Sequence, residues 1–104
     1  MEASMTPEQI ALQAIRERNS QLEALCARAG AALYQGQASR PEEGYKCAIS
    51  RQARVFRLDD GKIIVEGVQI WHKRFQTSNR MYFEVDDETA AKGVANEFLT
   101  RPFL

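Results

Sequence analysis

The chain has 104 residues, with 14 basic and 14 acidic residues and a formal net charge of zero at pH 7. Its 44% apolar and 27% charged residues are ordinary globular usage. This length allows one domain with a small core. Zero net charge argues against an acidic nucleic-acid mimic and against a uniformly basic packaging protein. Because there is no membrane-length apolar run and no signal-peptide pattern, we expect a cytoplasmic protein.

The residues that most often carry chemistry are few. Cys26 and Cys47 allow at most one disulfide and lack the paired spacing of a zinc site. His72 is the only histidine. It suits a general base beside a thiol or a carboxylate, but a lone histidine in a strand is more often structural. An enzyme is therefore the less favoured alternative, and we expect no metal, no cofactor and no catalytic residue.

The first predicted element is a long helix. Residues 1–5 are expected to form a flexible N-terminus and residues 6–36 a helix. Thr6 and Gln9 form a capping box at its start, because each side chain can bond to the backbone N–H of the other residue. Gly36 marks the expected end, since glycine favours the left-handed conformation found after helices.

Apolar residues recur along this helix at alternating spacings of three and four, a heptad pattern of about three repeats. Asn19 occupies a position where a buried Asn pairs best with its own copy in a two-stranded coiled coil. The pattern predicts a homodimer, while packing on the protein's own sheet is the alternative. A second capping box at Ser20 leaves a break into two shorter helices open, although we favour one. The residues assigned to self-association are Leu12, Ile15, Asn19, Leu22 and Cys26.

Residues 37–44 are polar, contain proline and glycine, and predict a linker. Residues 45–86 have the composition of an antiparallel sheet. Within them, two apolar runs flank an Asp-Asp-Gly turn in which Gly61 supplies the left-handed residue. This hairpin places Arg54 opposite Glu66, a pair of opposite charge.

A second hairpin is expected to turn at residues 77–79, where Asn79 tolerates the left-handed conformation. Gly67, inside the second strand of the first hairpin, is expected to mark a bulge or bend. The second hairpin predicts one core-facing set of side chains, namely Trp71, Phe75, Met81, Phe83 and Val85.

Residues 87–100 predict a final helix that is capped by Asp86 or Asp87, and residues 101–104 form a C-terminal tail. Small and apolar residues line one side of this helix at helical spacing. The expected fold is α+β in a single domain, 1–104, with the order helix, three-stranded antiparallel meander, helix.

This order is similar to that of a double-stranded-RNA-binding domain, and Ala91-Lys92-Gly93-Val94-Ala95 resembles the Ala-Lys-x-x-Ala pattern of that family's last helix. The family's phosphate-binding Lys-Lys pair is here Asp87-Glu88, and its Gly-Pro-x-His signature is missing. An acidic helix start repels phosphate. The resemblance therefore implies a protein-binding or dimerising derivative rather than an RNA binder.

Charge is segregated along the chain: residues 45–82 contain eight basic and three acidic residues, and residues 83–104 contain five acidic and two basic ones. A basic sheet with aromatic residues can stack bases and follow phosphates, so nucleic-acid binding is the alternative function. Lys and Arg also protect edge strands from aggregation. The residues assigned to partner binding are Trp71, Lys73, Arg74, Tyr82, Arg54 and Arg57.

Both faces of the predicted sheet carry apolar side chains, and an exposed apolar patch commonly marks an interaction site. We therefore expect a small non-enzymatic protein-binding module that acts as a homodimer. Regulators, adaptors, assembly chaperones and inhibitors of larger machines are modules of this kind.

Overall fold

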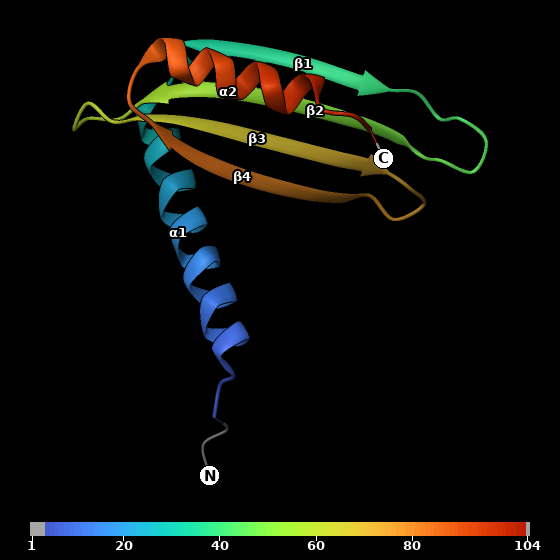
Figure 1. Ribbon diagram of the computed structural model, residues 1–104, viewed down its shortest axis with the longest axis horizontal. Coiled ribbons are helices and arrows are strands. Elements are labelled where there is room, and N and C mark those ends of the chain that lie inside the picture. The colour runs from blue at the N-terminus through green and yellow to red at the C-terminus, as the bar shows by residue number, and fades with distance from the viewer. Residues whose placement is uncertain (1–3, 104) are drawn as a thin grey trace.

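The computed structural model describes residues 4–103, which form two helices and one four-stranded antiparallel sheet (Figure 1). The elements are α1 (Pro7–Ala29), β1 (Tyr34–Arg40), β2 (Ala48–Arg57), β3 (Ile63–His72), β4 (Thr77–Val85) and α2 (Glu88–Thr100). The strands lie in the sheet in chain order. The α+β class is confirmed. Parts of the expected N-terminus and C-terminal tail, residues 1–3 and Leu104, lie outside the described residues.

The expected helix over residues 6–36 and linker over residues 37–44 are wrong, because a fourth strand, β1, occupies their junction. The helix ends at Ala29, and Gly30 follows with a left-handed φ of 81°. Exposure alternates along β1, as expected for an edge strand with one covered face. The three-stranded meander, which the resemblance to the RNA-binding family also implied, is therefore wrong.

At its start, α1 is as expected, because Thr6 and Gln9 form the capping box. The helix continues through Ser20 without a break, so the alternative of two shorter helices is wrong.

The β2–β3 hairpin has the predicted register, with Arg54 opposite Glu66 and Gly61 at a φ of 88°. The second hairpin turns earlier than predicted: β3 runs to His72, Thr77 already pairs with Trp71, and residues 73–76 form the turn. The predicted turn at residues 77–79 is therefore wrong.

Because of this shift, Phe75 lies in the turn with 77% of its surface exposed and is not part of the core. The other apolar residues assigned to the core from β4 do pack against it, namely Met81, Phe83 and Val85.

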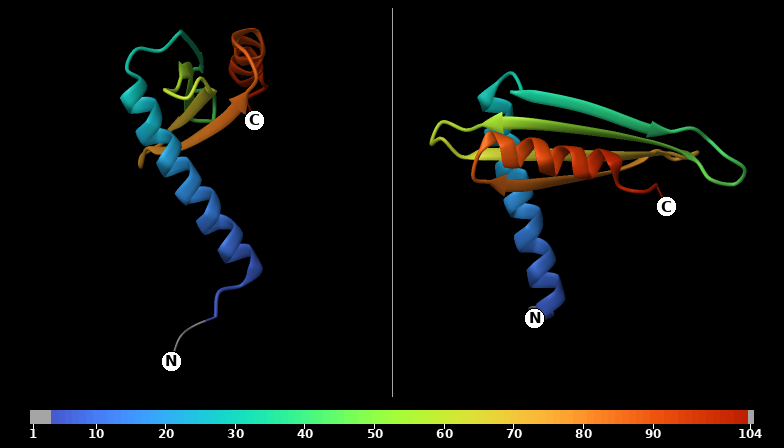
Figure 2. Two further views of the ribbon diagram at one scale, coloured as in Figure 1. Left: turned by 90° about the vertical axis from the view of Figure 1, so that its left-hand side faces the viewer. Right: turned by 45° about the horizontal axis from the view of Figure 1, so that its top comes forward.

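The helix α2 covers one face of the sheet, called the α2 face below, and α1 crosses the opposite face, called the α1 face (Figure 2). The two core clusters lie on these two faces. Gly67 pairs regularly with Ala53 and Met81, so the predicted bulge is wrong. A Cβ atom at Gly67 would lie 3.1 Å from the ring of Phe98, and glycine therefore lets this ring of α2 rest on β3. The buried residues on the α2 face are Ala53, Val55, Ile63, Val65, Ala91, Ala95, Phe98 and Leu99.

Arg51 fixes the C-terminal end of α2 to the sheet. Its side chain, only 5% exposed, donates hydrogen bonds to the carbonyl oxygens of Phe98 and Pro102, both at 3.2 Å, and to that of Arg101. The guanidinium also lies 4.0 Å from the centre of the Phe103 ring. The last turn of α2 has no basic residue of its own, so Arg51 supplies the positive charge that a helix C-terminus favours.

Candidate functional site

The C-terminal third of α1 is anchored on one end of the α1 face. Leu22, Cys26 and Ala29 pack there on large side chains from β2, β3 and β4 and the turn after β2. Cys26, 2% exposed, is the only residue of the described helix that is fully buried. The side chains beneath the helix are Phe56, Leu58, Ile64 and Tyr82.

A buried carboxylate lies beside this anchor. Glu66 is 2% exposed and accepts hydrogen bonds from the Arg54 guanidinium, at 2.9 Å and 2.5 Å, and from the Tyr82 hydroxyl, at 2.8 Å. Arg80 lies 4.0 Å from the other side of the same carboxylate and donates to Glu23 of α1 at 2.8 Å. The network joins β2, β3 and β4 to the helix, because a buried charge needs partners for each of its oxygens.

Burial changes the ionisation of two groups in this cluster. Burial, followed by the charge of Glu66, raises the pKa of the Cys26 thiol to about 11, against the opposing effect of Arg54. Burial and the hydrogen bond to Glu66 raise the pKa of the Tyr82 hydroxyl well above its usual range. Both groups are therefore neutral near pH 7, and Cys26 is a poor nucleophile.

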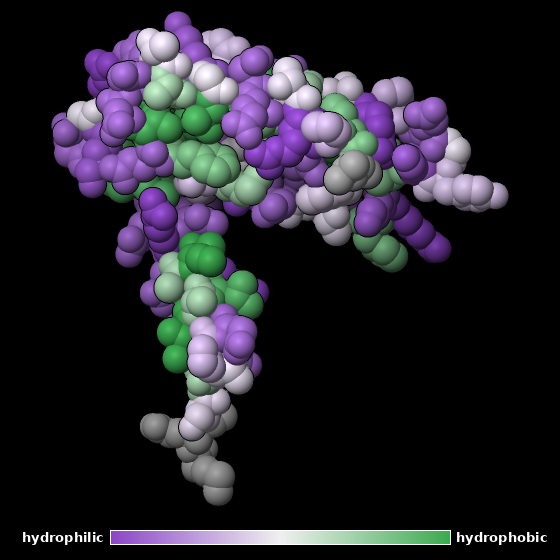
Figure 3. All heavy atoms as spheres, in the orientation of Figure 1, coloured by the Kyte–Doolittle hydropathy of each residue, from purple (hydrophilic) through white to green (hydrophobic). Residues whose placement is uncertain are grey.

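The N-terminal half of α1 extends beyond the sheet. Every residue from 7 to 18 is exposed, and the helix leaves the sheet past the outer edge of β4 (Figures 1 and 2). Ile10, Leu12 and Ile15 are 53–55% exposed. Green, hydrophobic atoms cover much of this projecting segment in Figure 3. A twelve-residue helix without packing is marginal in water, and this one presents large aliphatic side chains to solvent.

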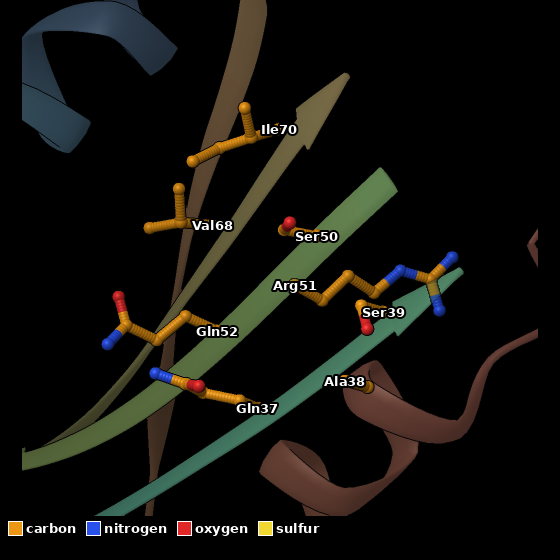
Figure 4. A pocket seen from close by; sticks show the side chains of 8 residues that line it. All are labelled: Gln37, Ala38, Ser39, Ser50, Arg51, Gln52, Val68 and Ile70. Carbon is orange, nitrogen blue, oxygen red and sulfur yellow. The ribbon is translucent and has the colours of Figure 1, made fainter. Parts of the chain in front are cut away.

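Beside the anchored part of α1, the α1 face is open. A hollow of about 450 Å³ lies over β1, β2 and β3, where Gln37, Gln52, Val68 and Ile70 surround small serine side chains (Figure 4). Arg51 borders this region through its backbone, but its guanidinium turns toward α2 (Figure 4). The surface is hollow here because the side chains of Ser39 and Ser50 are small, whereas the side chains that lie under α1 are large.

The residues assigned to self-association divide along the helix into two groups. Leu12 and Ile15 lie on the projecting half. Asn19 and Leu22 are half-buried where α1 meets the sheet, and Cys26 is buried under it. All five share one stripe of the helix, since they recur at spacings of three and four. Their role in self-association stays a prediction.

The residues assigned to partner binding do not gather at one place. Arg54 and Tyr82 belong to the Glu66 network, and Arg57 pairs with Glu88 of α2 at 2.5 Å. Trp71 is half-buried on the α2 face and lines a pocket beyond the end of α2 with Met81, Phe98 and Pro102.

Lys73 and Arg74 lie in the β3–β4 turn beside the exposed Phe75, and the Arg74 guanidinium is 5.8 Å from the centre of that ring. The β1–β2 loop, with Lys46 and the fully exposed Tyr45, lies at the same end of the sheet (Figure 1). Within residues 4–103, none of these three basic side chains makes an ion pair.

The remaining reactive residues are separated. The exposed His72 lies 2.7 Å from the Ser50 hydroxyl, measured at Nε2, and both cysteines are free thiols. In the described part of the chain, no three His, Cys, Asp or Glu side chains are grouped so that they could hold a metal ion. None of the helices described is long and apolar enough to cross a membrane.

Sequence reasoning missed the two arginines that organise the molecule, Arg51 and Arg80. The predicted register placed Glu66 opposite Arg54 but did not show that the carboxylate is buried. A buried acid needs a donor for each oxygen, and Arg80 lies on the neighbouring strand on the same face as Glu66, so this need is the signal that could have found it.

Comparison with models of protein families, with curated proteins and with solved structures gives no significant match to this chain.

Proposed function

We propose that the protein is a small, non-enzymatic protein-binding module that acts as a homodimer through α1. One observation carries the proposal. Leu12 and Ile15, in the N-terminal half of α1, are exposed to solvent, although they lie on the same stripe of the helix as Leu22 and Cys26, which pack on the sheet. A helix surface of this kind is typical of helix-in-groove recognition, in which apolar anchors recur at spacings of three and four. The capping box at Thr6 supports the proposal, because it keeps the exposed end helical before any partner is bound.

Light scattering at micromolar concentrations tests the dimer. We expect twice the chain mass for the wild-type protein and a monomer for the double variant Leu12→Glu/Ile15→Glu. Gln21→Glu is the matched control, because it adds charge at an exposed position on the same helix. Leu12 and Ile15 are more than half exposed on the projecting half of α1, so circular dichroism should report an unchanged fold. A monomeric wild-type protein across this range contradicts the dimer.

A second candidate function, nucleic-acid binding, is favoured by the end of the sheet where Tyr45 and Phe75 are exposed beside Lys46, Lys73 and Arg74. Aromatic rings stack on single-stranded bases and cations bind phosphates. The arginines of β2 and β4 are committed elsewhere: Arg51 holds α2, and Arg54, Arg57 and Arg80 pair with carboxylates. Fluorescence anisotropy with single-stranded RNA at low salt tests this function. Binding that falls steeply with salt, and is lost in Lys73→Ala/Phe75→Ala, is the expected result.

A further inference from the structure

We propose that two copies of the chain join edge to edge along β4, so that the projecting half of each α1 lies across the open α1 face of the partner's sheet. This arrangement rests on the homodimer proposed above and specifies how it is built. Each copy has three features without a partner, namely the projecting half of α1, the unpaired edge of β4 and the hollow beside α1. In the proposed dimer, the second copy covers or pairs with each of them.

The length of α1 matches a double-width sheet. At 1.5 Å per residue, its 23 residues span about 35 Å. Four strands at a spacing of about 4.8 Å measure only about 14 Å between the outer strand axes. Glu23 already reaches Arg80 on β4, and residues 7–18, which are all exposed, lie beyond the sheet. Residues 7–18 extend about 18 Å, which is enough to cross a second four-stranded sheet placed beside β4.

The outer edge of β4 is suited to pairing with its own copy. Within residues 4–103, β3 is the one strand that pairs with β4, so the outer edge of β4 presents a row of unpaired backbone donors and acceptors. In an antiparallel pair centred on Tyr82, Arg80 of each copy lies opposite Glu84 of the other, on the α1 face. The same register places Met81 opposite Phe83 on the α2 face. Opposite charges and apolar side chains facing each other are the pairs that stabilise antiparallel strands.

This pairing also fills the hollow. The symmetry that relates the two β4 strands runs the two α1 helices antiparallel, side by side on a continuous sheet. The row that contains Phe56 and Ile64 holds the chain's own helix, and Ile64 lies opposite Glu84. The two-fold axis at Tyr82 relates this row to the row of Gln52 and Val68, which lies opposite Arg80. The two rows are four residues or about 13 Å apart, which leaves room for two helices that pack at 8–10 Å. The partner's helix therefore falls over Gln52 and Val68, with Ile70 beside it. Leu12 and Ile15 of the partner would cover Val68 and Ile70.

Cysteine cross-linking tests this placement. In a Cys47→Ser background, the double variant Leu12→Cys/Ile70→Cys should give a covalent dimer with a short bifunctional maleimide. The two positions are far apart within one copy, because Leu12 lies on the part of α1 beyond the sheet. Neither single variant should cross-link, since each residue is distant from its own counterpart across the two-fold axis. The buried thiol of Cys26 stays unreactive in this background.

The outcomes separate this arrangement from the proposed function. Cross-linking by Leu12→Cys alone would mean a parallel α1 zipper, which overturns the arrangement but leaves the dimer. A dimeric mass with no cross-link in any variant does the same. A monomeric mass overturns both proposals.

A second variant tests the β4 edge. Glu84→Arg places like charges opposite Arg80 of the partner and should raise the dissociation constant about tenfold. The same charge change in the β1–β2 loop, Glu42→Arg, should leave the constant unchanged. Equal effects of the two substitutions overturn the pairing of β4 with its copy.

Discussion

The two faces of the sheet are covered to different extents. On the α2 face, α2 and the strands enclose an apolar core, and Arg51 holds the helix end. On the α1 face, an apolar cluster occupies one end, a buried carboxylate with three polar partners follows, and an open hollow comes last. We therefore assign stability to the α2 face and the proposed association to the open part of the α1 face. Changes on the α2 face should act on folding, whereas changes beyond the α1 anchor should act on association.

The largest effect is expected on the α2 face. Phe98→Ala removes a ring that is 3% exposed and rests on Gly67, and it should lower the free energy of unfolding by about 3–5 kcal/mol. Urea unfolding followed by circular dichroism measures this loss. Phe75→Ala is the matched control, because the same truncation in the exposed turn should change stability by less than about 0.5 kcal/mol. Similar losses in the two variants would contradict the placement of the core.

The Glu66 network should give the next largest effect. Glu66→Gln keeps the shape of the side chain but removes the charge that Arg54 and Arg80 face, and it should cost about 2–3 kcal/mol of unfolding free energy. Glu42→Gln, at an exposed loop position, serves as the control. If Glu66→Gln is as stable as the wild-type protein in urea, the buried carboxylate does not hold the α1 face together.

The thiol of Cys26 predicts a loss of stability in alkali. Its pKa is raised from 9.0 to about 11 in the folded protein, so the unfolded chain releases the proton first as pH rises. Well below pH 9 the thiol is protonated in both states and has no effect. The free energy of unfolding should fall as pH rises from 9 toward 11, with about 1 kcal/mol lost by pH 10. Cys26→Ala should lose this component of the slope, whereas Cys47→Ala should keep it.

The smallest effect is expected at the ion pair between Arg57 and Glu88. Both side chains are about half exposed, so water and salt screen their attraction. Arg57→Ala should change the thermal midpoint by no more than the equivalent of about 0.5 kcal/mol, and added salt should reduce the difference further. A large loss would mean that the contact between α2 and the end of β2 depends on this pair more than its exposure indicates.

Patterns of local origin were readable from the sequence. The capping box at Thr6, the Asp-Asp-Gly turn and the register that pairs Arg54 with Glu66 all depend on residues close together in the chain, and each is confirmed. β1 was missed because its residues are polar and follow an Ala-rich helix, so that pairing along β2 alone makes them a strand.

The candidate site was readable only in part. The heptad spacing identified Leu12 and Ile15, but periodicity cannot tell which part of a long helix its own sheet covers. That depends on the width of the sheet and on the angle at which the helix crosses it. Phe75 shows the same limit, because a turn four residues earlier moved it from the expected core to the surface.

The docking of α2 by Arg51 has a consequence for synthesis of the chain. Ribosomes deliver the N-terminal elements first, so all four strands emerge before the helix that covers their apolar side. Until Phe98 and the residues after it are synthesised, the guanidinium of Arg51 lacks the carbonyl groups to which it donates hydrogen bonds. The apolar side of the meander therefore stays uncovered until α2 is synthesised, and chaperones that bind exposed apolar surfaces should improve the yield of folded protein.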